Sequence, residues 1–233
     1  MLFQRFFSEN FDCDITRWSS PLPPASCAVI VVLYWAVNVF LPHCFSALEL
    51  QLTVSSLAAL GLVTGYLLRR PEKFFQVCSF RQLQRGTAWK VALSVFLILL
   101  SGFIFNYWSL EFFKFTGLAV EENQALTEVL KEAALSERII IGFVVILLAP
   151  VGEEIVFRRM LYGLLLPLGA VKAVLLTSFL FSIGHFYLVG IPGLFFLGLI
   201  LQLLYLHSRN LWCPVQVHAV FNALSFVSVL FSS

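Results

Sequence analysis

The stretch RIIIGFVVILLAPVGEEIVFRRMLYGLLLP, residues 138–167, decides the fold class because it is a long apolar run that carries charges near its middle. A helix needs about 20 residues to cross the ~30 Å hydrocarbon core of a bilayer, and this run is long enough. Within it lie Glu153, Glu154, Arg158 and Arg159. An ionisable group at that depth costs several kcal/mol, so it persists where it is paired, hydrated or used. The stretch therefore predicts a membrane-spanning helix with a polar site.

The composition of the whole chain agrees with this interpretation. Of 233 residues, 60% are hydrophobic and 12% charged, and the mean hydropathy is +0.91. A soluble domain carries roughly a quarter charged residues, so a water-soluble globule is excluded. We predict an all-α, polytopic transmembrane helical bundle of about seven spans, with six or eight as alternatives. Besides the region 138–166, the expected spans are 25–42, 47–68, 89–108, 169–189, 191–206 and 211–231.

Charge in the connecting segments predicts the topology. Short loops rich in Lys and Arg stay cytoplasmic, which places the basic loop 69–88 inside and the acidic loop 109–137, with its six glutamates, outside. The chain then divides into an N-terminal cytoplasmic segment (1–24), three first helices (25–108), the acidic loop and a helical core (138–231). We expect a multi-pass membrane protein with a cytoplasmic N-terminus.

Other classes of partner and site are disfavoured. The net charge is +2 and no basic tract is long enough for a nucleic-acid groove, so we expect no nucleic-acid partner. Five cysteines are scattered without a CxxC pair, which indicates neither a disulfide framework nor a thiolate zinc site. The expected surroundings are the lipid bilayer.

The two adjacent glutamates are expected to have separate tasks. Consecutive helical residues diverge by about 100°, so Glu153 and Glu154 cannot point the same way. Glu154 and Arg158 are spaced i, i+4 in the favourable order for a buried ion pair. Pro150 and Gly152 are expected to loosen the helix just upstream, which is tolerated where a water-filled cavity is lined.

Three further polar residues lie on the later spans: His185 on 169–189, and His218 and Asn222, one helical turn apart, on 211–231. One carboxylate, two imidazoles and one carboxamide suit hydrolysis, which needs a base for the attacking water and donors for the oxyanion. The sequence has no supported serine–histidine–acid pattern, so water is the simpler nucleophile. The hypothesis is peptide hydrolysis by glutamate-activated water.

Three motifs occur in order on successive predicted helices: Glu153-Glu154-x-x-x-Arg158, Phe181-x-x-x-His185 and His218-x-x-x-Asn222. Together they resemble the type II CAAX prenyl endopeptidase family, also called the CAAX protease and bacteriocin-processing (CPBP) family of intramembrane proteases.

This resemblance implies a helical bundle with a polar cavity open toward the cytoplasm, and endoproteolysis of a membrane-associated protein or peptide. It implies that Glu153 activates water with help from His185, that His218 and Asn222 stabilise the oxyanion, and that Glu154 and Arg158 support them. The compact chain is more similar to bacterial members, which implies a bacterial plasma membrane.

Three alternatives stay open at this point. Glu153, His185 and His218 could instead hold zinc with an open fourth position, which would make the protein a metalloprotease rather than a glutamate protease; the preferred mechanism requires no cofactor. The same polar cluster could serve a non-catalytic membrane scaffold or a bacteriocin-immunity protein. It could also relay protons in a transporter, although no inverted repeat supports this.

Overall fold

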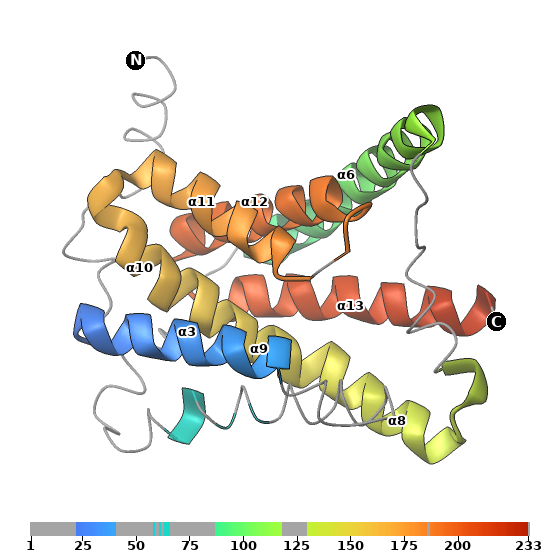
Figure 1. Ribbon diagram of the computed structural model, residues 1–233, viewed down its shortest axis with the longest axis horizontal. Helices are drawn as coiled ribbons and strands as arrows, with labels where there is room; N and C mark the ends of the chain where they lie inside the picture. Colours follow the sequence, from blue (N-terminus) through green and yellow to red (C-terminus); the bar gives the residue numbers. More distant parts are fainter. Residues whose placement is uncertain are drawn as a thin grey trace.

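The computed structural model describes residues 22–40, 58, 61, 63–65, 87–117, 130–185 and 187–232 (Figure 1). Within these ranges the chain is helical and contains no strand, which confirms the predicted all-α bundle. The elements, in order, are α3 (Pro24–Phe40), α6 (Thr87–Thr116), α8 (Leu135–Phe143), η2 (Val144–Leu148), α9 (Ala149–Glu154), η3 (Ile155–Leu161), α10 (Tyr162–Leu165), η4 (Leu166–Leu168), α11 (Ala170–Ile183), α12 (Ile191–Ser208) and α13 (Trp212–Ser232).

Four helices in the described ranges are long and apolar enough to cross a membrane. They cover Ala88–Thr116, Leu135–Leu168, Ile191–Ser208 and Trp212–Phe231, and two shorter apolar helices accompany them. The predicted count of seven spans stays a prediction. Nearly all of the predicted segment 1–24, span 47–68 and basic loop 69–88, and residues 118–129 of the acidic loop, lie outside the described residues.

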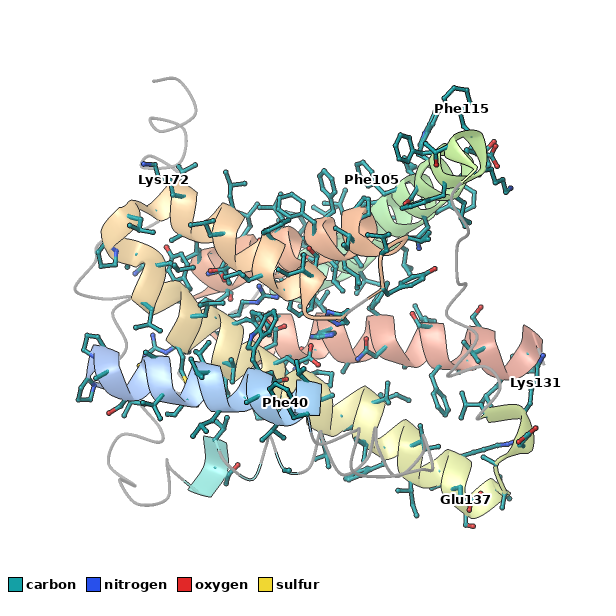
Figure 2. The ribbon with its side chains drawn as sticks, in the orientation of Figure 1. Phe40, Phe105, Phe115, Lys131, Glu137 and Lys172 are labelled. Atoms are coloured by element: carbon teal, nitrogen blue, oxygen red, sulfur yellow. The ribbon has the colours of Figure 1, made fainter. Side chains whose placement is uncertain are left out.

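Side chains at the periphery suit a bilayer. Phe115, 90% exposed, projects from the end of α6, and Lys131, Glu137 and Lys172 lie at the outer ends of the bundle (Figure 2). Exposed large apolar side chains also follow α6 from Trp89 onward. In water such a surface would be unfavourable, whereas lipid tails solvate it.

Two helices end at residues other than those predicted. α6 continues to Thr116 instead of ending at 108, because residues 109–116 are rich in Phe and their two charges, Glu111 and Lys114, pair at 2.9 Å. α11 ends at Ile183 rather than near 189. A turn follows, and Pro192 at the start of α12 has the fixed φ that suits a first helical turn.

The helix that carries the two glutamates is a composite. From Leu135 to Leu168 it runs through α8, η2, α9, η3, α10 and η4, and the α-helical segment Ala149–Glu154 lies between two π-helical segments. π-helical turns are rare and occur often at functional sites. The first of them ends at Leu148, two residues before Pro150, which has no N–H to continue the α-helical hydrogen bonds. The predicted loosening near Pro150 is therefore a change of helix type on both sides of the glutamates.

α3, α11 and α13 pack against this composite helix. α3 contacts η3 from one side, and α13 contacts η2 and α9 as well as α6 and α12 (Figure 1). α11 and α12 pack so closely that a Cβ added to Gly198 would lie 3.2 Å from the Ser178 Cα atom. This contact brings the middle of α12 next to the glutamates.

Replacing Gly198 by alanine should lower the free energy of unfolding by about 1–3 kcal/mol, because the added methyl group would meet the backbone of Ser178 and the ring of Phe181, both at 3.2 Å. Gly102→Ala in α6 is the matched control, since its added Cβ meets no described atom within 4 Å. Unfolding of the purified protein by SDS in mixed micelles measures both. Equal losses in the two variants would contradict the close α11–α12 contact.

Candidate functional site

Glu154 is fully buried and paired with Arg158, as the i, i+4 spacing predicts. The Arg158 Nε atom donates to Glu154 Oε2 at 2.7 Å, and Nη2 donates to Oε1 at 3.3 Å. The third guanidinium nitrogen, Nη1, donates to the backbone oxygen of Gly198 at 3.1 Å, and the group lies 5.0 Å from the centre of the Phe181 ring. Besides the ion pair itself, groups from α12 and α11 therefore use the remaining hydrogen-bonding and electrostatic capacity of Arg158.

His218 connects the two glutamates. Its Nδ1 lies 3.0 Å from Glu154 Oε1, and its Nε2 lies 3.8 Å from Glu153 Oε2. The carboxylate of Glu154 only accepts hydrogen bonds, so Nδ1 is the donor and the other ring nitrogen is turned to Glu153. His218 is 2% exposed. A continuous row of polar groups thus runs from Arg158 to Glu153 across two helices.

Glu153 points into a cavity of about 90 Å³. Its Oε2 atom is buried and has no hydrogen-bond partner within the described chain. A water molecule needs roughly 10–15 Å³ of such space, so the cavity has room for several. Glu153 therefore lines the cavity with hydrogen-bonding capacity that the described chain does not use.

His185 lines the same cavity, from the turn that follows α11. Its Nδ1 lies 2.8 Å from the Phe181 carbonyl oxygen, which can only accept. This contact places the proton on Nδ1 and leaves Nε2 as the acceptor of a neutral imidazole. Since α11 has 14 residues, His185 lies beyond its end, in the turn.

Asn222 contacts the backbone of the composite helix. Its Nδ2 donates to the carbonyl oxygen of Val145 at 2.8 Å, within the π-helical segment η2. It is not among the residues around the cavity of Glu153. The structure thus brings Glu153 and His185 to one cavity and His218 beside Glu153, while Asn222 joins α13 to the composite helix.

The sequence-based analysis missed the contribution of α3. Tyr34, Trp35 and Asn38 line the cavity opposite Glu153, and Asn38 Nδ2 donates to the Tyr34 carbonyl oxygen at 2.8 Å. Tyr34 also contacts the Phe157 ring edge-on, with centroids 6.4 Å apart. A signal was present: Tyr34 and Asn38 are polar, are spaced i, i+4 and interrupt an apolar span.

The donor set for zinc is not assembled. Among the described residues, no three His, Cys, Asp or Glu side chains gather closely enough to hold a metal ion. The arrangement of Glu153, His185 and His218 therefore does not fit a zinc site with three protein ligands.

Truncating Arg158 to alanine should destabilise the protein by about 3–5 kcal/mol, because Glu154 would be left as an uncompensated buried charge. The matched control is Glu111→Gln, which breaks the exposed pair with Lys114 and should cost less than about 1 kcal/mol. Unfolding by SDS gives both values. A loss below 1 kcal/mol for Arg158→Ala would show that the buried pair does not hold the site together.

Comparison with protein families supports the motif resemblance. The family model described as "Type II CAAX prenyl endopeptidase Rce1-like" matches residues 135–224, which is less than half of the chain. No curated protein and no solved structure gives a significant match. The matched region begins with α8, ends within α13 and includes all three motifs. Residues 135–224 of this membrane protein thus match the Rce1-like type II CAAX prenyl endopeptidase family, as the three motifs predict.

Proposed function

We propose that this protein is an intramembrane endopeptidase that hydrolyses a peptide bond of a membrane-associated protein or peptide, using water activated by Glu153. The family match supports the protease class. The observation that carries the mechanism is the place of Glu153: it lines a water-sized cavity together with His185, and its buried Oε2 atom has no hydrogen-bond partner in the described chain.

In the proposed reaction, the Glu153 carboxylate removes a proton from a water molecule in the cavity while the water oxygen attacks the carbonyl carbon of the substrate. A tetrahedral oxyanion forms. The proton then passes from Glu153 to the amide nitrogen, the C–N bond breaks, and a carboxylic acid and an amine leave. His185 Nε2, the acceptor left by the contact of Nδ1 with Phe181, holds the water in line.

The two residues of the third motif take different parts in this proposal. His218 positions Glu153, since its Nε2 lies 3.8 Å from Oε2, and it can donate to the oxyanion when Nε2 carries a proton. Asn222 holds α13 to η2, and donation to the oxyanion would require its Nδ2 to leave Val145 or to use its second N–H. We also infer a bacterial plasma membrane and a cytoplasmic N-terminus, from the family resemblance and the distribution of Lys and Arg.

One observation favours a second function, that of a non-catalytic scaffold or immunity protein. The contacts of Glu154, Arg158 and Asn222 described above are internal ones that pin helices together. A cluster retained for stability would show the same contacts. The two functions differ in what they require of Glu153.

The isosteric change Glu153→Gln should lower the rate of cleavage by about 10²–10⁴-fold, because the amide cannot accept the proton of water. His185→Ala should also abolish most cleavage. The measurement uses the purified full-length protein in lipid vesicles with a mixed set of membrane-tethered fluorogenic peptides. Glu111→Gln, on the exposed part of α6, is the control and should cleave at the unchanged rate.

Unchanged cleavage in folded Glu153→Gln would remove the assignment of the base. A wild-type protein that cleaves no peptide, together with full cellular function of Glu153→Gln, would favour the scaffold.

A further inference from the structure

A second cavity, of about 390 Å³, adjoins the first at His185. It lies among α6, the turn after α11, α12 and α13. Figure 1 draws α6 and α12 above α13. Its size falls within the range of small-ligand sites. Apolar side chains from three helices line it, among them Leu99, Phe103, Leu197 and Phe221.

Asn106 supplies a carboxamide to this apolar wall. It lies in the membrane-spanning candidate Ala88–Thr116. Asn38 and Asn222, on other helices, each donate to a backbone carbonyl oxygen at 2.8 Å, whereas no hydrogen bond joins the Asn106 side chain to another described residue. The residue is exposed and lines the cavity, so its carboxamide is open to a polar ligand there.

The carboxamide of this exposed residue lies close to α12. A Cβ atom added to Gly193 of α12 would lie 3.1 Å from Asn106 Oδ1 and 3.7 Å from its Cγ. The carboxamide therefore lies against the backbone of α12, at the wall of the cavity. The glycine at 193 leaves the space that it occupies.

We propose that this cavity binds the segment of the substrate next to the scissile bond, as an extended chain with apolar side chains, and that Asn106 hydrogen-bonds to its main-chain amide. The inference rests on the proposed function. A carboxamide offers one acceptor and two donors, which matches the C=O and N–H of a peptide bond, whereas a hydrocarbon tail has neither. An extended peptide within a membrane also requires partners for its backbone groups.

The position of His185 gives the direction of the chain. Because His185 lines both cavities, a peptide in the larger one reaches the smaller one, where Glu153 holds the attacking water. Asn106 is then a positioning residue: it fixes the register of the substrate and does not touch the reacting atoms.

The test measures binding without turnover, in the full-length Glu153→Gln protein in nanodiscs. The probe is a fluorescein-labelled ten-residue peptide of Leu, Ala and Val, compared by fluorescence anisotropy with analogues in which one amide N–H at a time is replaced by an ester oxygen. Asn106→Leu, of similar size, should weaken binding of the parent peptide about three- to tenfold. At one position the ester should weaken binding to the Asn106 protein by a similar factor and have no effect in Asn106→Leu.

Ser101→Ala is the control on the same helix, since Ser101 Oγ donates to the Ile98 carbonyl oxygen and Ser101 does not line the cavity. The Kd of the parent peptide for this variant should be unchanged.

The ester series on the Asn106 protein tests the proposal even where Asn106→Leu fails to fold. Equal binding of every ester and the parent peptide would overturn it. A labelled fatty acid that displaces the peptide, and whose own binding is unchanged by Asn106→Leu, would also overturn it, since the occupant would then be a lipid tail. If one ester weakens binding in this Asn106-dependent way but the wild-type protein cleaves no peptide, the proposed function is contradicted while the proposed peptide-binding site stands.

Discussion

The buried ion pair of Glu154 and Arg158 is the constraint on which the rest of the site depends. In hydrocarbon neither charge is tolerated alone, and each must use its remaining hydrogen-bonding capacity. The pair does so with groups from three other helices: the Gly198 carbonyl oxygen of α12, the face of Phe181 in α11 and the imidazole of His218 in α13. Satisfying one pair thereby fixes the orientation of three helices. The neighbouring Glu153 stays outside the pair and lines the cavity, and its buried Oε2 atom has no hydrogen-bond partner among the described residues.

The π-helical segments follow the same rule. A change of helix type leaves backbone carbonyl groups without their usual i+4 partners, and in a membrane each such group needs a donor. Pro150, which has no N–H, adds to this shortage. Asn222 supplies one of the missing donors: its Nδ2 donates to the Val145 carbonyl oxygen at 2.8 Å. The irregular helix and the carboxamide one turn beyond His218 are therefore two parts of one solution, which keeps α13 against the glutamates.

Local spacing predicted what depends on local geometry. The Glu154–Arg158 pair follows from an i, i+4 separation on one helix, and the separate directions of Glu153 and Glu154 follow from the 100° step between neighbours. The partner of Asn222 could not be predicted in this way, since Val145 is 77 residues away and its carbonyl is available only because the helix is π-helical there. The roles of Tyr34 and Asn38 also depend on which helices become neighbours. The length of α11 was overestimated because residues 184–189 are apolar enough to continue a span, although the chain turns there.

That turn explains how water and peptide can meet inside an apolar bundle. α11 has 14 residues, so it rises ~21 Å, less than the ~30 Å hydrocarbon core. α11 is therefore too short to cross this core by itself, and irregular backbone within a membrane is stable only where protein or a wet cavity surrounds it. Short contacts within the turn, such as His185 N to Ser182 O at 3.3 Å and Gly190 N to Tyr187 O at 3.1 Å, satisfy part of the backbone. The two cavities border the turn on either side, and His185 lies in the wall of both. A short helix thus creates the polar pocket, and the same shortness places an imidazole between a small cavity suited to water and a larger one suited to a peptide.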